Sequence, residues 1–131
     1  MPGIYEIVKN RKTYSVDANQ TVFEAARLMA EQNIGAVAVL RDGHLAGIFS
    51  ERDIVKRVVA NGRIPGTTRV SEVMTTNPRV VSPDESVDEC LFIMREFGFR
   101  HLPICQDHQL MGLISLRDLL VISNVQQRAS A

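Results

Sequence analysis

The sequence predicts an α+β fold with some α/β character, built from two tandem copies of one strand–helix–strand–strand–helix unit. Three observations support this. The chain matches itself at a constant offset without gaps, so that Val16 falls on Val81 and Asp53 on Asp118. Each copy combines a helical apolar spacing with short apolar runs of strand length. The content of 45% hydrophobic and 23% charged residues in 131 residues is typical of one globular module rather than a disordered chain.

The first copy begins with an expected strand at residues 14–16. Thr21 and Glu24 then fit a capping box, and the apolar residues after them have the spacing of one buried helical stripe. An Asp-Gly turn between apolar runs predicts a hairpin of two strands, residues 36–40 and 45–49. A second helix is expected to begin near Ser50.

The second copy repeats these signals. We expect a strand, a capped helix that starts at Ser86, a hairpin and a last helix near Ser115, with the strands at residues 79–81, 102–105 and 110–114. Short helical turns are expected before the copies, at residues 4–8 and 70–74. The chain is thus one module, 1–131, with the first motif at 7–60, a linker at 61–70 that contains Gly and Pro, the second motif at 71–125 and a flexible tail at 126–131.

Composition and charge exclude several classes of protein. The 15 basic and 15 acidic side chains give a net charge of zero, which argues against binding to nucleic acid through bulk charge. No apolar run reaches the length of a membrane span, and the N-terminus lacks a signal-peptide pattern, so we expect a cytoplasmic protein without a membrane partner. Cys90 and Cys105 have no metal-ligand spacing and are expected to be inert, and the sequence offers no nucleophile–base pair, so no metal site and no enzyme are expected.

The most informative local feature is a repeated Gly-x-x-Ser-x-x-Asp segment where a strand gives way to a helix. One explanation is structural, because Ser and Asp are ordinary helix-capping residues. The other is functional. A Ser hydroxyl can bind a phosphate oxygen, an Arg adds a charged fork, an Asp carboxylate accepts hydrogen bonds from ribose hydroxyls, and Gly lets a ligand approach the backbone. A cap needs no Arg, so the repeat of all three favours the second explanation; the residues are Ser50, Arg52, Asp53, Ser115, Arg117 and Asp118.

Together with the segments 70–75, 77–83 and 99–104, these motifs make the chain resemble a CBS-domain pair, the cystathionine β-synthase-type tandem repeat or Bateman module, of the stand-alone bacterial kind. The resemblance covers nearly the whole chain. It implies two CBS motifs packed with pseudo-two-fold symmetry. It also implies clefts between the repeats that bind adenosine-containing ligands: AMP, ADP, ATP, NAD or S-adenosylmethionine.

The resemblance also assigns roles to residues. It implies that Asp53 and Asp118 hold a ribose and that Ser50 and Ser115 reach a phosphate. It implies that the segments before the first helices line the base, largely with backbone, at Thr13, Tyr14, Ser15, Arg79 and Val80. The segment with Arg100, His101 and Pro103 is expected to flank ligand phosphates.

The copies differ at this last segment. The first copy has Gly35, Ala36 and Ala38 where the second has Arg100, His101 and Pro103. The first site therefore lacks the positive and polar groups of this segment, and the second site is expected to bind more tightly. For His101, a half-buried structural role is an open alternative, as is a merely exposed helix position for Arg52 and Arg117.

The function expected from these observations is a non-catalytic ligand sensor. It requires no cofactor, takes an adenosine-type molecule as its regulatory ligand, forms a homodimer and signals to an unknown regulated protein by conformational or dimer rearrangement. A ligand-free dimerisation or assembly module is the alternative.

Overall fold

The computed structural model describes the backbone of residues 3–130 and the side chains as far as Asn124. It divides into two compact units. The first-repeat unit is Tyr14–Pro78, and the second-repeat unit combines the segment before Tyr14 with the chain from Arg79 onward. Residues 7–13, which we expected in the first motif, therefore pack with the second repeat.

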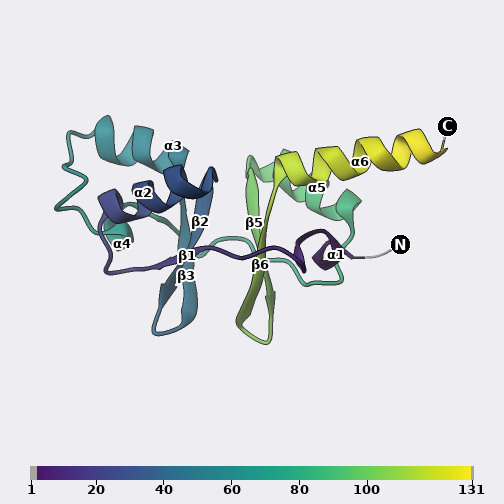
Figure 1. The fold of residues 1–131 in the computed structure, drawn as a ribbon, viewed down its shortest axis with the longest axis horizontal. Helices are drawn as coiled ribbons and strands as arrows, with labels where there is room; N and C mark the ends of the chain where they lie inside the picture. The colour runs from purple at the N-terminus through teal and green to yellow at the C-terminus, as the bar shows by residue number, and fades with distance from the viewer. Residues whose placement is uncertain (1–2, 131) are drawn as a thin grey trace. The chain divides into compact units, whose positions relative to one another are not determined.

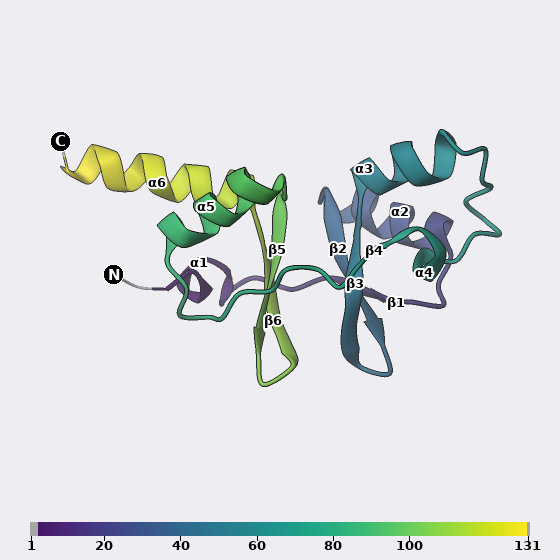
Figure 2. The same cartoon turned by 180° about the vertical axis from the view of Figure 1, so that it is seen from behind.

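The first-repeat unit contains a four-stranded sheet in the order β1-β2-β3-β4, and Figure 1 labels the first three of these strands. β1 and β2 are parallel, and the β2–β3 and β3–β4 pairs are antiparallel. Figure 2 shows the short strand β4, which we did not expect, beside β3. The elements in chain order are β1 (Ser15–Asp17), α2 (Val22–Gln32), β2 (Ala36–Arg41), β3 (His44–Ser50), α3 (Glu51–Asp53), the π-helix η1 (Ile54–Val59), α4 (Val70–Val73) and β4 (Thr75–Thr76).

Local sequence explains the boundaries of these elements. Thr21 caps α2 through the expected capping box with Glu24, and Asn33 ends this helix in the left-handed conformation at φ 55°. The β2–β3 hairpin turns through Asp42 and Gly43, both with positive φ, as the Asp-Gly signal predicts. The linker covers the start of α2, where the backbone N–H of Val22 donates to the carbonyl of Thr68 at 2.8 Å.

The second-repeat unit has the same helix–strand–strand–helix order but a sheet of only two strands. Its hairpin pairs β5 with β6. The short helix α1 comes from the N-terminal segment and contacts β6. The elements are α1 (Tyr5–Val8), α5 (Val87–Phe97), β5 (His101–Gln106), β6 (Gln109–Ser115) and α6 (Leu116–Ser130).

The strand expected at residues 79–81 is reduced to a single bridge between Val81 and Ile104. Pro103 gives the physical reason. At the matching position of the first unit, the N–H of Ala38 donates to the carbonyl of Tyr14. Pro103 has no N–H, so it cannot donate to Arg79 in the same way, and the parallel pairing is shorter.

The last helix is longer than expected. α6 continues to Ser130, through the residues where we expected a flexible tail. Gln, Arg and Ala in this stretch are favourable helix residues, and the stretch contains no Gly or Pro that would end the helix.

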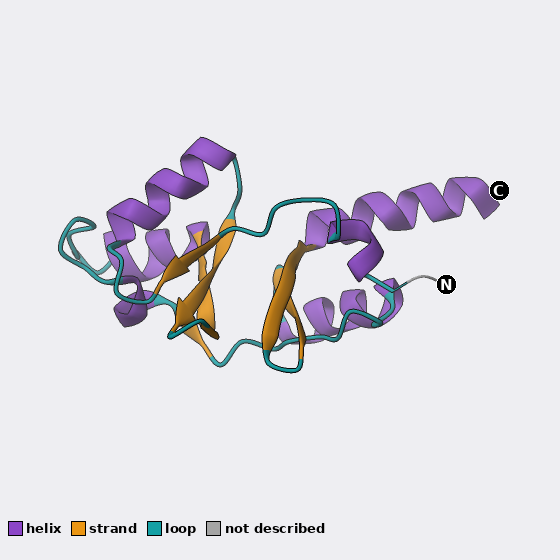
Figure 3. Cartoon of the chain, turned by 60° about the horizontal axis from the view of Figure 1, so that its bottom comes forward, coloured by secondary structure: helices purple, strands orange, loops and turns teal. Residues whose placement is uncertain are grey.

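Each unit has its own hydrophobic core, and in each the helices lie on one side of the strands (Figure 3). Phe49 is the largest fully buried side chain of the first core, and Leu102, Ile104 and Ile114 are fully buried in the second. Met29, Met94 and Cys90 are buried on the helical stripes that the sequence indicated. The two cores therefore form as separate apolar clusters.

Candidate functional site

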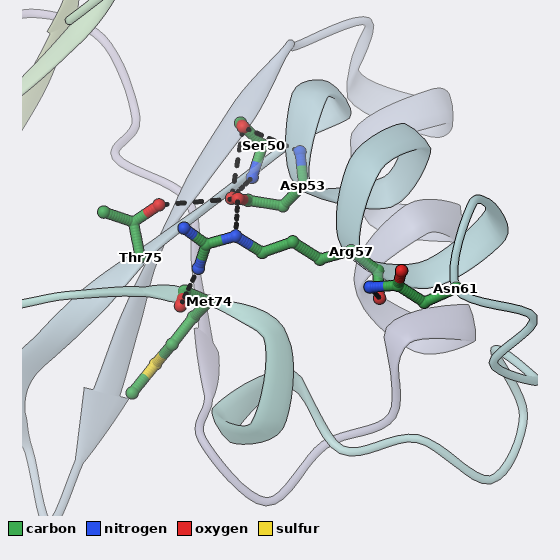
Figure 4. A network of polar contacts seen from close by, with 6 residues as sticks. All are labelled: Ser50, Asp53, Arg57, Asn61, Met74 and Thr75. Carbon is green, nitrogen blue, oxygen red and sulfur yellow. Dashed lines mark hydrogen bonds and ion pairs between the residues drawn. The ribbon is translucent and has the colours of Figure 1, made fainter.

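The Ser and Asp of the first repeat are joined where β3 ends and α3 begins (Figure 4). The backbone N–H and the hydroxyl of Ser50 donate to Oδ2 of Asp53 at 3.0 Å and 3.2 Å. The N–H of Asp53 lies 3.3 Å from Oγ of Ser50, which completes a capping box. Asp53 is only 6% exposed. These contacts hold one carboxylate oxygen in a fixed position and leave the other to different partners.

That second oxygen, Oδ1 of Asp53, has only long contacts. The hydroxyl of Thr75 lies 3.4 Å away and Nε of Arg57 lies 3.5 Å away. Arg57 instead uses Nη1 to donate to the carbonyl of Met74 at 2.9 Å. Hydrogen bonds to an ionised oxygen are normally about 2.7–2.9 Å long. Oδ1 therefore keeps capacity to accept a stronger hydrogen bond.

The second repeat has the same local pair with a different outer partner. The N–H of Ser115 donates to Oδ2 of Asp118 at 2.8 Å, and the N–H of Asp118 donates to Oγ of Ser115 at 3.0 Å. The guanidinium of Arg11 then binds both carboxylate oxygens, with Nη1 at 2.9 Å from Oδ1 and Nη2 at 2.7 Å from Oδ2. Nη2 also donates to the carbonyl of Leu113 at 3.1 Å. Asp118 is thus held in a two-pronged ion pair.

Sequence reasoning missed Arg11, Arg57 and Thr75 as neighbours of the carboxylates. At the repeat offset Arg11 falls on Thr76 and Arg57 falls on Ile122, so a search for repeated polar residues passes over both arginines. Thr75 lies in one of the segments that carry the family resemblance, and this was the only available signal for it. Each carboxylate has an arginine beside it, but the two arginines come from non-equivalent positions.

The Arg11 ion pair lowers the pKa of Asp118. Burial alone would raise this pKa, but the hydrogen bonds from Arg11 and Ser115 outweigh it. A carboxyl whose pKa is lower in the folded chain stabilises the fold above the unfolded-state value of 3.8, and this contribution disappears as the pH falls through the folded value.

We therefore expect Arg11→Gln to lower the free energy of unfolding by about 1 kcal/mol at pH 7, a modest value because the pair is partly exposed. Urea unfolding between pH 7 and pH 2 measures this, and the difference from wild type should disappear once Asp118 is protonated. Lys9→Gln, whose ion-pair partner is Glu6, is the matched control. A difference that persists unchanged at pH 2 would contradict the role of Asp118.

The glycine of each motif is required by packing. A Cβ on Gly47 would lie 2.5 Å from the backbone oxygen of Thr75 and 2.8 Å from the sulfur of Met74. A Cβ on Gly112 would lie 2.8 Å from Cγ2 of Val8. The sequence suggested that glycine leaves room for a ligand. In the structure this room is instead occupied by the chain that follows α4 at Gly47 and by α1 at Gly112.

Most of the remaining residues expected in the first site lie at one end of the sheet. Ser15 pairs with Ala38 and Ser50 pairs with Ala36, so both serines lie near the start of β2. Tyr14 precedes β1, and its hydroxyl donates to Gln32 at 2.8 Å. Thr13 is half-buried and lies at the end of the N-terminal segment, in the second-repeat unit.

In the second-repeat unit, His101 pairs with Ser115 at the end of the β5–β6 hairpin. Arg100 is exposed and its carbonyl accepts from the N–H of Leu116 at 2.8 Å. Gly35 makes the same backbone contact to Glu51 in the first unit, so this contact does not depend on the Arg100 side chain. His101 is half-buried, which matches the structural alternative and leaves its predicted contact with a phosphate as a proposal.

Three further predicted residues have different environments. Pro103 is buried within β5, opposite Leu113. Arg79 places its guanidinium 5.7 Å from the ring centroid of Phe97, a cation–π contact, and Val80 is exposed. Pro103 therefore belongs to the sheet, while Arg79 and Val80 lie at the surface.

Arg52 and Arg117 are the arginines of the two motifs. Each is exposed, and neither forms an ion pair within the part of the chain whose side chains are described. Their charge is therefore not neutralised by a neighbouring carboxylate. An arginine in this state can bind an anion without first giving up a partner.

The cysteines have the environment of structural thiols. Cys90 is buried, and burial together with Glu85 and Glu89 raises its pKa to about 11, while burial raises the pKa of Cys105. Among the described residues there is no group of His, Cys, Asp or Glu that could hold a metal ion. None of the described helices has both the length and the apolar character needed to cross a bilayer.

The two copies of this geometry correspond to a known domain. A family model described as the CBS domain matches residues 4–60 and again residues 70–124. The chain belongs to the CBS-domain family. It is a CBS-domain pair, a regulatory module, which confirms the resemblance drawn from the motifs.

Individual CBS-domain proteins resemble it over most of their length. The CBS domain-containing protein YhcV of Bacillus subtilis (strain 168) is 41% identical over 107 residues, which are 82% of this chain and 76% of YhcV. A solved CBS-domain protein of Burkholderia ambifaria MC40-6 has 39% identity and a TM-score of 0.89, and the match covers 95% of this chain and 96% of that chain.

A more distant structure shares the fold. The CBS domain pair of protein MJ0100, solved in complex with 5′-methylthioadenosine and S-adenosyl-L-methionine, is 22% identical. Its TM-score is 0.83, and the match covers 95% of this chain and 97% of that chain. The α+β fold with two CBS repeats is therefore confirmed.

Proposed function

We propose that this CBS-domain pair is a cytoplasmic, non-catalytic regulatory module that binds an adenosine-containing ligand through its two Ser–Asp pairs. The ligand is AMP, ADP, ATP, NAD or S-adenosylmethionine. It acts as a regulatory ligand, so no catalytic cofactor is required. Binding alters the conformation of the module, or of a dimer of it, and thereby the activity of a regulated protein.

The observation that carries this proposal is the state of Asp53. Oδ2 is held by Ser50, whereas Oδ1 makes only long contacts to Thr75 and Arg57. A fixed carboxylate with one under-used oxygen is suited to the hydroxyl donors of a ribose, because a carboxylate accepts and never donates. A helix cap alone requires only the Oδ2 contacts.

The arrangement of positive charge agrees with a ligand that carries an anion. Arg52 and Arg117 are exposed next to the two Ser–Asp pairs. Arg100 and His101 lie at the hairpin end that contains Ser115. A guanidinium binds phosphate or carboxylate oxygens with two parallel hydrogen bonds, so the same arginines suit a nucleotide phosphate or the carboxylate of S-adenosylmethionine. We propose the base contacts at Thr13, Tyr14, Ser15, Arg79 and Val80.

The related MJ0100 structure lends support, because the ligands named for it both contain adenosine. Its identity with this chain is 22%, so the support concerns the class of ligand and not its exact identity. Several large apolar side chains on helices are exposed and are suited to a homodimer interface; they are Phe23, Val55, Val59, Phe92, Phe97, Leu120 and Val121.

A ligand-free assembly module is the second candidate. The same exposed apolar side chains favour it, and capping alone accounts for the Ser50–Asp53 and Ser115–Asp118 contacts. It does not account for Arg52 and Arg117, which have no structural ion-pair partner among the described side chains.

Thermal unfolding with a panel of ligands separates the two candidates. We expect at least one of AMP, ADP, ATP, NAD and S-adenosylmethionine to raise the melting temperature by roughly 10 °C at about 100 times its Kd, because a ligand that binds only the folded chain stabilises it. GMP and CMP are the controls for the adenine base. No shift with any of the five ligands, together with a dimer mass by light scattering, would favour the assembly module instead.

A further inference from the structure

The two motif carboxylates differ in how much of their accepting capacity is already used. An ionised carboxylate has about four lone-pair positions, two on each oxygen. On Asp118, Oδ2 accepts from Arg11 and from the N–H of Ser115, and Oδ1 accepts from Arg11. About one position remains, whereas a ribose diol that binds through both hydroxyls needs two.

Asp53 has no such competitor. Its nearest arginine, Arg57, lies 3.5 Å from Oδ1 through Nε and donates through Nη1 to the carbonyl of Met74. Arg57 is also fixed on the helix that follows the motif, four residues from Asp53. Arg11 lies instead in the exposed segment between α1 and β1, which contains no helix or strand.

Arg11 can leave Asp118 at low cost. Its side chain is 45% exposed and that of Asp118 is 20% exposed, so water can solvate both charges when they separate. Its guanidinium also donates a hydrogen bond of 3.1 Å to the carbonyl of Leu113, a neutral acceptor. The ion pair is therefore strong enough to compete with a ligand and exposed enough to open.

We propose that Arg11 is an autoinhibitory latch on the second motif: it occupies the carboxylate of Asp118 and must release it before a ribose can bind there. The inference rests on the proposed function and adds a control that acts on one motif only. It also bears on the expectation that the second motif binds more tightly. While Arg11 is bound to Asp118, the ligand affinity of the second motif is lowered, which opposes this expectation. Once Arg11 is removed, the second motif is free to bind more tightly than the first.

The latch predicts effects of opposite sign on stability and on affinity. In an Asp53→Asn background, which leaves the second motif as the intact one, Arg11→Gln should tighten AMP binding roughly fivefold, since a partly exposed pair opposes binding only modestly. Calorimetric titration of the full chain measures this. The gain should be smaller for 2′-deoxy-AMP, which keeps the phosphate but lacks the diol. Lys9→Gln, which removes the same charge from the same segment, should leave both affinities unchanged.

Three other results would overturn the latch. If AMP binds but Arg11→Gln leaves its affinity unchanged, Arg11 has a structural role only and the latch is wrong. If Arg11→Gln weakens AMP and 2′-deoxy-AMP alike, Arg11 is a phosphate contact and the latch is again wrong. If AMP, ADP, ATP, NAD and S-adenosylmethionine all fail to bind either chain, the proposed function fails and the latch fails with it.

Discussion

Gly47→Ala should lower the free energy of unfolding by about 2–3 kcal/mol, the cost of forcing a methyl group into a packed position. The new Cβ would lie 2.5 Å from the backbone oxygen of Thr75, so relief requires β4 to move away from β3. The Cβ of Gly112→Ala would meet side chains and no backbone, with Cγ2 of Val8 the nearest atom at 2.8 Å, and the substitution should cost about 1 kcal/mol. Urea unfolding followed by circular dichroism measures both values.

Gly66→Ala is the matched control for this prediction. A Cβ on Gly66 meets nothing within 4 Å, and its φ is not positive, so the substitution should change the stability by less than about 0.5 kcal/mol. If Gly47→Ala were as stable as Gly66→Ala, the backbone of Thr75 could not lie as close to Gly47 as the structure has it. If Gly112→Ala lost more stability than Gly47→Ala, the side chain of Val8 would be a harder obstacle than the backbone of Thr75, and our explanation of the two costs would be wrong.

The internal repeat made most of the fold predictable. The caps at Thr21 and Ser86, the Asp-Gly turn and the apolar stripes are local signals, and the structure confirms the helices and hairpins that they predict. A local signal cannot say which repeat a neighbouring segment packs against. The N-terminal segment precedes the first repeat yet packs with the second, and this depends on tertiary contacts such as that of Val8 with Gly112.

The departures from the repeat arise from single residues. Pro103 removes one backbone donor and shortens the expected strand at residues 79–81 to a bridge.

The sequence correctly joined Ser50 to Asp53 and Ser115 to Asp118, because partners three residues apart at a helix start are fixed by local geometry. It could not find Arg11, which is 107 residues from Asp118 along the chain.

The largest expected effect on binding comes from the two motif carboxylates. Asp53→Asn/Asp118→Asn keeps the side-chain shape and one acceptor oxygen at each site but removes both charges. A hydrogen bond to a charged acceptor contributes about 1.5–3 kcal/mol, so we expect a loss of affinity on the order of 100-fold for the adenosine ligand that raises the melting temperature most. Equilibrium titration of the double variant against wild type measures this loss.

Controls for the double variant separate folding from binding. Its circular dichroism spectrum should match that of wild type, because an Asn oxygen can still accept from the N–H of Ser50 or Ser115. Arg27→Gln, which removes an exposed ion pair with Glu31, should bind the ligand as wild type does.

Equilibrium titration of wild type, Asp53→Asn/Asp118→Asn and Arg27→Gln under one set of conditions tests most directly whether Asp53 and Asp118 bind an adenosine-containing ligand. Saturable binding to wild type and Arg27→Gln, with loss of binding by the folded double variant, is the result we predict. Equal binding by all three chains would contradict the assignment of Asp53 and Asp118 as the ribose-binding groups.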